Sequence, residues 1–251
     1  MKEPPKIQEE KRIEPPPPPS APPLRTKVIL PVVQNPQDKS EMVLIPTGPL
    51  FPPSPSSQKE KQGKDVIKVE VYQYYIDKLE ISYEQFNVFL SEKNLKKTER
   101  AASCPDCAAG HVSFELASGY CQWAGKRLPS ELEWLKAAQG DKASPWPWGD
   151  HYEPGRANIF GEEDGYPAGS PVGSFPLGAS GYGVKDMIGN AWEWVSSPYL
   201  PGKENEIPKG DGVLKGGSWR SLPEQADLSY RHVVNKNLGL ENFGFRCAKS
   251  F

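Results

Sequence analysis

The 251-residue chain has a net charge of −2, and 37% of its residues are hydrophobic. This near-neutral composition is typical of a globular protein and gives no electrostatic reason to expect nucleic acid or an anionic membrane as a partner. No apolar run reaches the length of a membrane-spanning helix. The residues after Met1 are polar and do not resemble a secretory signal.

Residues 1–40 are predicted to form a disordered tether outside the folded domain. Nine of the first 23 residues are proline, including the run Pro15–Pro19. Such a segment favours polyproline II and acts as a semi-rigid spacer, with a ligand for a proline-binding domain as the alternative. Residues 53–64 are expected to form a surface loop. Residues 41–251 are enough for one domain with a sizeable core.

Two strands are expected early in the domain. Met42–Pro46 is a short apolar run stopped by proline, and residues 67–76 begin with alternating apolar and charged side chains. Two further strand-like segments, residues 213–219 and 243–248, close the chain. Residues 141–215 are rich in Gly, Pro, Asn and Asp with scattered tryptophans, which indicates a loop-rich half held by aromatic packing or metal.

Three helices are predicted between these strands. A Ser-x-x-Gln capping box opens a helix over residues 82–92. A second helix over residues 113–124 is followed by Gly125, the residue type that favours a left-handed C-terminal cap. A Ser-x-x-Glu box opens a third helix from Ser130 to the residue before Gly140.

The nine residues Asp186–Trp194 combine two indoles, two carboxylates and a turn glycine. If the chain turns at Gly189, Asp186 and Glu193 converge, and carbonyls freed by the turn join them. Hard cations such as calcium prefer this oxygen set. The alternative is a tight turn before a core strand, with Glu193 in a salt bridge.

The pair Cys104 and Cys107 has Cys-x-x-Cys spacing. A structural zinc site needs four ligands, and only His111 offers a third. A redox pair is a second interpretation, but no thioredoxin-like strand and helix pattern lies nearby. We expect a local disulfide that fixes a loop.

Several motifs together resemble the formylglycine-generating enzyme (sulfatase-modifying factor) family. They lie in residues 120–134, 148–150, 156–158, 171–176, 189–194, 216–219 and 244–246, with opening strands at 42–46 and 76–80. The resemblance covers residues 41–251. It implies an α+β fold with a C-type-lectin-like core, little regular secondary structure and many loops.

The family's enzymes oxidise a sulfatase cysteine to formylglycine with two cysteines that bind copper(I). Counted from the Gly216–Trp219 motif, the resemblance puts these positions at Ser221 and Ala226. Copper(I) is soft and prefers thiolates, which a hydroxyl and a methyl group do not replace. Formylglycine-generating activity is therefore not expected, and no catalytic residue is assigned.

The positions of the family's calcium ligands, unlike those of its copper ligands, carry suitable residues. The resemblance puts the first site at Asn158, Ile159, Asp164 and Tyr166, and the second at Asp186, Gly189, Ala191 and Glu193. The Ile, Tyr, Gly and Ala positions act through backbone carbonyls, and every side-chain ligand carries oxygen. Calcium is the only cofactor predicted, and loops that hold themselves without metal are the alternative.

The resemblance also pairs Cys121 with Cys247 in a disulfide, with two buried free thiols as the alternative. Such a bridge is worth roughly 4–5 kcal/mol in the chain-entropy model. Disulfides predict an oxidising compartment, namely the periplasm, the cell surface or the secreted state. No signal is visible in the sequence, so Met1 is interpreted as the start of a trimmed or mature form. The proline-rich tether is interpreted as a segment that once joined the domain to an anchor or to another domain.

The remaining polar candidates are weak. The histidines His111, His151 and His232 show no helical metal-ligand spacing, so an iron site like that of the family's sulfoxide-forming members is not expected. Four residues near the former catalytic segment line a cleft or lie in solvated surface: Glu224, Asp227, Arg231 and His232.

The sequence thus predicts a non-catalytic, calcium-stabilised module for binding or scaffolding outside the cytoplasm. Its expected partner is a protein or cell-surface ligand, without nucleic acid or direct membrane insertion, and its tether is a candidate anchor. The alternative is an enzyme of the same fold that catalyses a different oxidation. Blockage of the cleft by Trp219 or Leu222 would favour binding, whereas convergence of His232 with acidic side chains would favour the enzyme.

Overall fold

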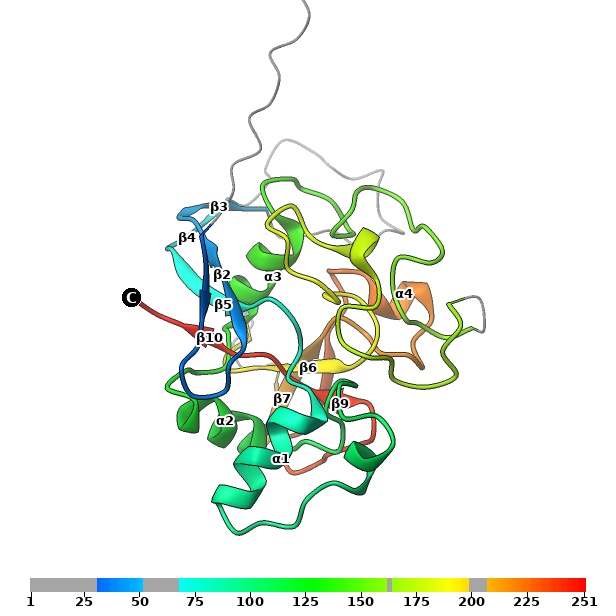
Figure 1. The fold of residues 1–251 in the computed structure, drawn as a ribbon. Helices are drawn as coiled ribbons and strands as arrows, with labels where there is room; N and C mark the ends of the chain where they lie inside the picture. Colours follow the sequence, from blue (N-terminus) through cyan, green and yellow to red (C-terminus); the bar gives the residue numbers. More distant parts are fainter. Residues whose placement is uncertain (1–30, 52–67, 162–163, 199–206) are drawn as a thin grey trace, which may run out of the picture.

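The computed structural model describes residues 31–51, 68–161, 164–198 and 207–251. Most of the predicted tether and the predicted loop at residues 53–64 lie outside these ranges. Within them, no helix is both long and apolar enough to cross a membrane. The architecture is α+β with extensive loops, as predicted (Figure 1).

In the described ranges, ten short strands form three sheets. The strands are β1 (Val32–Gln34), β2 (Glu41–Ile45), β3 (Gly48–Leu50), β4 (Val69–Val71), β5 (Tyr74–Asp77), β6 (Trp192–Val195), β7 (Asp211–Lys215), β8 (His232–Asn235), β9 (Phe243–Gly244) and β10 (Ala248–Lys249). The first sheet has the order β1-β2-β5-β10, the second pairs β3 with β4, and the third has the order β8-β7-β6-β9. All pairs are antiparallel except β6 with β9.

The three predicted helices form at the predicted positions, and one further helical turn and two 3-10 turns were not predicted. They are α1 (Tyr83–Glu92), α2 (Phe114–Trp123), α3 (Glu131–Gln139) and the single turn α4 (Pro223–Ala226), with 3-10 turns η2 (Glu99–Ala102) and η3 (Pro176–Gly178). Both capping boxes are present, at the start of α1 and of α3. Each box satisfies amide donors that a helix start leaves unpaired, which explains why these starts were predictable.

The folded part starts earlier than the predicted boundary at residue 41. Strand β1 pairs with β2, so that Val32 lies opposite Val43. The side-chain amide of Asn35 donates to the Ala124 carbonyl over 3.0 Å, and Asp38 is buried in an ion pair. The sequence does not predict that this segment is folded, because the segment is held by contacts with distant residues and follows a proline-rich stretch.

Two predicted strands are each divided into two. Residues 67–76 were expected as one strand, but β4 and β5 belong to different sheets and flank an exposed break at Tyr72 and Gln73. Residues 243–248 likewise contain β9 and the start of β10, which join different sheets. An apolar run fixes which side chains are buried, but not where the backbone changes its pairing partner.

Aromatic side chains hold the loop-rich half, as predicted. Trp146 stacks on Trp148 at a centroid distance of 5.5 Å and also contacts Tyr152. The Trp134 and Trp194 rings are fully buried in the two apolar clusters of the core. Figure 1 shows these green and yellow loops on the side of the molecule opposite the blue and cyan strands of the first sheet.

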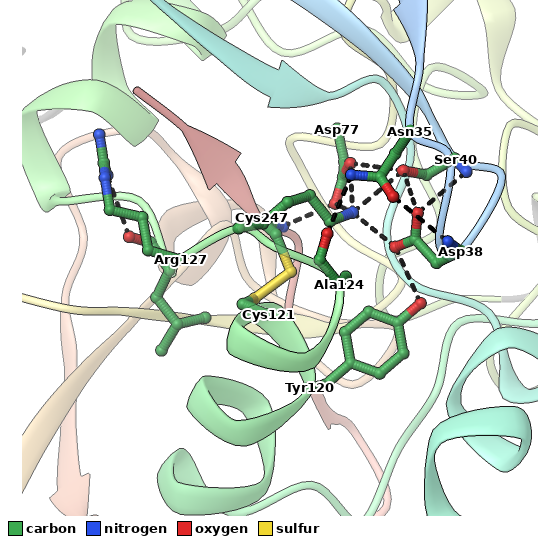
Figure 2. The surroundings of a disulfide bond; sticks show 11 residues. Asn35, Asp38, Ser40, Asp77, Tyr120, Cys121, Ala124, Arg127 and Cys247 are labelled. Carbon is green, nitrogen blue, oxygen red and sulfur yellow. Dashed lines mark hydrogen bonds and ion pairs between the residues drawn. A yellow bond between two sulfur atoms is a disulfide. The ribbon is translucent and has the colours of Figure 1, made fainter. Parts of the chain in front are cut away.

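A buried ion cluster joins the first sheet to the end of α2 (Figure 2). The Lys126 ammonium lies 2.6 Å from Asp38 and 2.8 Å from Asp77, and none of the three side chains is more than 1% exposed. Burial pushes the pKa of Asp38 upward, but the adjacent Lys126 outweighs it and lowers that pKa overall. Tyr120 donates to the same Asp38 carboxylate over 3.0 Å.

Candidate functional site

The segment that the resemblance matches to the copper-binding positions is buried and bonded to its own turn. Ser221 and Ala226 are 3% and 0% exposed. The Ser221 hydroxyl accepts the Ser218 amide over 3.0 Å, and the Asn242 side chain donates to the Ser218 hydroxyl over 2.9 Å. A Cβ added at Gly217 would lie 2.7 Å from the Ala226 methyl. Gly217 and the turn around it therefore lie between Ser221 and Ala226, and neither position offers a soft ligand.

A small pocket lies beside this segment, and we call it the Trp219 pocket. It has a cavity volume of about 20 Å³, and its lining includes Tyr83, Arg100, Cys107, Gly169, Asn190 and Trp219. This volume is about that of one or two water positions. The guanidinium of Arg220 lies 4.3 Å from the Trp219 ring centre and pairs with Glu241, which also lines the pocket. Trp219 is thus part of the lining of a small pocket, whereas Leu222 is exposed.

Of the four polar candidates that follow this segment, two have partners within the fold and one is exposed to solvent. Asp227 is buried and accepts the backbone amides of Ser229 and Tyr230. Arg231 pairs with the buried Glu131, and Glu224 is exposed.

His232 is stacked on Trp192 at a centroid distance of 5.2 Å. Burial lowers the pKa of His232, because it disfavours the charged imidazolium. Within the described part of the chain, His232 has no hydrogen bond or ion pair with an acidic side chain, and burial alone shifts its pKa.

The histidines and cysteines form no open metal centre within the described ranges. The one group there with three close metal-binding side chains is Cys104, Asp106 and Cys107. Its sulfurs are already bonded to each other, because Cys104 and Cys107 form a disulfide. Cys121 and Cys247 form the second disulfide (Figure 2), so all four cysteines of the sequence are paired.

The first predicted calcium site lies in a loop whose backbone amides are bonded by the site's own aspartate, Asp164. One Asp164 oxygen accepts the Ile159 amide over 3.1 Å, and the other accepts the Tyr166 amide over 2.9 Å. Asn158 is fully buried, and its side-chain amide donates to the Ala168 carbonyl over 2.9 Å. This bond fixes the orientation of Asn158 and turns its Oδ1 atom away from that carbonyl.

The second predicted site follows a sharp turn next to the first. Gly189 has a φ of 78°, and a Cβ there would lie 2.1 Å from the Asn158 carbonyl oxygen. Only glycine fits this backbone approach. The Asn190 amide donates to that carbonyl over 2.7 Å, so the turn brings the two predicted sites into direct contact.

Glu193 is the most engaged of the predicted ligands. Its Oε1 accepts Nη2 of Arg246 over 2.7 Å, and its Oε2 accepts Nε of the same arginine over 2.8 Å. The Trp134 indole donates to Oε2 over 2.7 Å. Glu193 therefore forms the salt bridge that the sequence analysis gave as the alternative to metal ligation.

Glu80 is a functional candidate that the sequence reasoning missed. It is 2% exposed, and its carboxylate accepts the Ala191 amide over 3.1 Å and the Asn190 side chain over 2.9 Å. Burial, followed by the charges of Asp186 and Glu193, raises the pKa of Glu80 well above its usual range. The resemblance at residues 76–80 marked this residue as part of an opening motif, but its proximity to Asp186 depends on the fold.

Two orphaned oxygens support a cation here. Among the described residues, three buried side-chain polar atoms have no hydrogen-bond partner: Gln139 Oε1, Asn158 Oδ1 and Asp186 Oδ1. Two of the three belong to predicted calcium ligands, one in each site. Buried polar atoms are nearly always paired, so an unpaired oxygen next to excess carboxylate charge fits a hard cation. The donor set therefore fits calcium and does not fit copper(I).

Comparison with known proteins assigns the chain to a family. Residues 30–251 match the model of the sulfatase-modifying factor enzyme 1-like domain. Relatives include the inactive C-alpha-formylglycine-generating enzyme 2 of Mus musculus, 38% identical over 56% of this chain and 48% of the relative. The serine/threonine-protein kinase pkn1 of Chlamydia pneumoniae is 32% identical over 84% of this chain and 38% of the relative. The hercynine oxygenase of Mycolicibacterium smegmatis is 37% identical over 49% and 32%, respectively.

The chain therefore spans about half or less of these relatives. Among solved structures, PvdO from Pseudomonas aeruginosa superposes with a TM-score of 0.75 at 24% identity, covering 88% of this chain and 98% of PvdO. CarF superposes with a TM-score of 0.65 at 17% identity, covering 85% and 99%. Both confirm the fold. The chain belongs to the sulfatase-modifying factor family, whose domain model covers all of its described residues.

Proposed function

We propose that this domain is a non-catalytic, calcium-stabilised binding module that works outside the cytoplasm. The observation that carries the proposal is the closed segment around Ser221 and Ala226, where the hydroxyl bonds to its own turn and the methyl packs on Gly217. Copper(I) chemistry needs soft ligands at these two positions. The name of the inactive mouse relative agrees with this interpretation.

Calcium is proposed as a stabilising ion. Asn158 and Asp186 would supply the side-chain oxygens that lack partners, and Asp164 and Glu193 would complete the two sites with the carbonyls of their loops. A bound cation would also offset the buried negative charge, since Glu80, Asp186 and Glu193 face a single buried arginine, Arg246. Its role would be to fix loops, which requires no chemistry of the ion.

The proposed partner is a protein, and its docking surface lies next to the first calcium site. Phe160 is 65% exposed and Leu222 is 49% exposed. The Phe160 amide donates to the Ser221 carbonyl over 2.9 Å, which holds the two loops side by side. Between them lies a depression of about 290 Å³ lined by Phe160, Tyr152, Asp164 and Pro223. Projecting apolar side chains with an aromatic anchor are typical of protein interfaces.

The compartment follows from the cysteines. Two disulfides are typical of proteins in oxidising surroundings. We infer that the domain works in the periplasm, on the cell surface or in the secreted state. The enzymatic alternative draws on the hercynine oxygenase relative, but His232 is stacked on Trp192 and the Trp219 pocket has room for little more than water.

Native mass spectrometry with calcium and copper(I) tests the metal part of this proposal. We expect the folded domain to retain calcium and to bind no copper(I), because all four of its cysteines are in disulfides and supply no thiolate. Stoichiometric copper(I) on the oxidised protein would contradict the proposal. Oxidised protein must be used, because reduction would create thiols elsewhere.

Site-specific photo-crosslinking tests the docking surface. A crosslinking residue at Phe160 is compared with one at Val88, an exposed position on α1 with 48% exposure. We expect Phe160 to crosslink to a defined protein in cells of the natural source, and Val88 to give no such product. Identical products from both positions would rule out a binding surface at Phe160.

A further inference from the structure

The two disulfides differ in what they connect and in how they are exposed. Cys121 and Cys247 are separated by 126 residues, and both are 0% exposed (Figure 2). Cys104 and Cys107 are separated by three residues; Cys107 is 2% exposed, whereas Cys104 is only half-buried. Thiol–disulfide exchange needs direct access to a sulfur, so a thiolate from solution reaches Cys104 first.

The surroundings also decide which sulfur leaves. The Cys104 sulfur lies 3.4 Å from the Asp106 carboxylate, which disfavours negative charge on Cys104. The Cys107 sulfur lies 3.3 Å from the Gly169 carbonyl oxygen, which would accept the S–H of a released thiol. Attack at Cys104 with departure of Cys107 is therefore favoured over the reverse.

The backbone holds Cys107 in place while Cys104 is more weakly held. The Cys107 carbonyl accepts the Tyr83 amide over 2.9 Å, and the Pro105 carbonyl accepts the Glu84 amide over 2.8 Å. These donors are the first amides of α1, so the backbone of Pro105 and Cys107 is fixed to the start of that helix. Cys104 instead follows the exposed turn η2, to which its amide bonds at the Arg100 carbonyl.

The same disulfide joins two walls of the Trp219 pocket. Cys107 and Ala108 line the pocket from the segment fixed against α1, and Arg100 lines it from η2. With the disulfide closed, η2 and this segment are tied together within four residues of Arg100. With it open, η2 loses this covalent link and keeps the hydrogen bonds of its own turn and those between Asn87 on α1 and Thr98.

We propose that Cys104–Cys107 is a thiol–disulfide exchange site whose reduction removes the covalent link that restrains the Arg100 wall of the Trp219 pocket. The co-reactant is a dithiol. Its first thiolate attacks Cys104, the Cys104–Cys107 bond breaks, and Cys107 leaves as a thiolate that takes up a proton. The second thiolate of the dithiol then attacks the mixed disulfide and releases Cys104. The dithiol is oxidised to a disulfide, and the protein gains two electrons and two protons.

Graded reduction of the folded protein tests the proposal directly. The protein is treated with dithiothreitol under native conditions, alkylated at intervals and mapped by peptide mass spectrometry. We expect the pair Cys104 and Cys107 to open at least about tenfold faster than Cys121 and Cys247. Equal rates for both disulfides, or resistance of the local pair until the protein unfolds, would overturn it.

Single substitutions test the direction of attack. Cys107→Ser leaves the thiol of Cys104, and Cys104→Ser leaves that of Cys107; each is titrated with an aromatic disulfide reagent. We expect the first variant to react at least about tenfold faster, because the burial of Cys107 outweighs the unfavourable charge of Asp106 beside Cys104. In the otherwise unaltered protein, Asp106→Asn should speed reduction by removing a like charge next to the attacked sulfur. A faster reaction of Cys104→Ser would reverse the assignment.

Amide hydrogen exchange tests the consequence for the pocket without any substitution. Reduction limited to the local pair should raise exchange in residues 99–104 and leave α2 unchanged. Unaltered exchange in residues 99–104 after confirmed reduction would show that the disulfide does not hold the Arg100 wall.

Discussion

Arg246 and Glu193 form a buried, two-bonded ion pair in which neither side chain is more than 1% exposed. The pair connects strand β6 to the segment between β9 and β10. The same guanidinium donates to the backbone carbonyls of Lys185 and Asp186, so it braces the turn that carries the second predicted calcium site. Burial pushes the pKa of Arg246 downward, but Glu193 outweighs it and raises that pKa overall.

Glu193→Gln should therefore destabilise the domain even without calcium. The substitution leaves a buried guanidinium without its counter-charge, a change that costs roughly 3–5 kcal/mol in buried pairs. Urea unfolding in excess chelator measures the loss. Glu41→Gln is the control, because Glu41 pairs with Lys78 at the surface and should cost less than about 1 kcal/mol. A loss for Glu193→Gln that appears only with calcium would mean that metal ligation, not the ion pair, is its structural role.

Calcium should raise the melting temperature, and chelation should lower it. A ligand that binds only the folded state adds about 2.7 kcal/mol when its concentration is 100 times Kd. Asp186→Asn should weaken this response, because it removes charge from a ligand whose Oδ1 has no other partner. Glu84→Gln, an exposed acid on α1, should retain the full response. Melting curves indifferent to both chelator and calcium would remove both proposed sites.

Lys126→Met and Lys78→Met make a matched pair. Each lysine lies within 2.7 Å of a carboxylate, but the Lys126 side chain is 0% exposed and that of Lys78 is 31% exposed. Loss of Lys126 leaves Asp38 and Asp77 buried without a cation, so we expect roughly 3–5 kcal/mol of destabilisation. Lys78→Met should cost less than about 1 kcal/mol. Similar losses in denaturant unfolding would show that burial does not decide the strength of these pairs.

Glu133 gives the stability a defined pH dependence. Burial pushes its pKa upward, but bonds from Arg127 and the Ser130 amide outweigh this and lower it below the usual 4.5. A folded state that binds fewer protons than the unfolded state gains stability as the pH rises. The contribution is therefore present above pH 4.5 and is lost as the pH falls through the folded pKa.

Glu133→Gln tests this dependence, because it keeps a hydrogen-bonding side chain but removes the charge. The unfolding free energies of the unaltered protein and the variant should differ by about 1 kcal/mol at neutral pH. The difference should shrink in acid. A difference that stays constant across the acid range would mean that packing, not charge, gives Glu133 its role.

The helices were predictable because their starts are encoded locally. The side chains of Ser82 and Ser130 satisfy amides within three residues of themselves, so the pattern in the sequence is the bond in the structure. The breaks between β4 and β5 and between β9 and β10 depend on which distant strand is paired. Local periodicity contains no such information.

The candidate site likewise has parts that the sequence located and parts that depend on the fold. The motif resemblance located the loops around Asn158 and Asp186, and the structure brings them into contact at Gly189. Glu80 was missed, since its carboxylate reaches Ala191 across 111 residues of sequence. The Trp219 pocket also depends on contacts between separate segments, including Cys107, Gly169 and Trp219.

The claim that this domain has no formylglycine-generating activity is tested most directly by peptide turnover. Oxidised protein is incubated with a Cys-x-Pro-x-Arg peptide, copper and a reductant too weak to open its disulfides, and the peptide mass is followed. An active formylglycine-generating enzyme serves as the positive control. Because Ser221 and Ala226 supply no thiolate, we predict that the peptide cysteine remains unchanged while the control converts it. Repeated turnover by the unaltered protein would contradict the non-catalytic assignment.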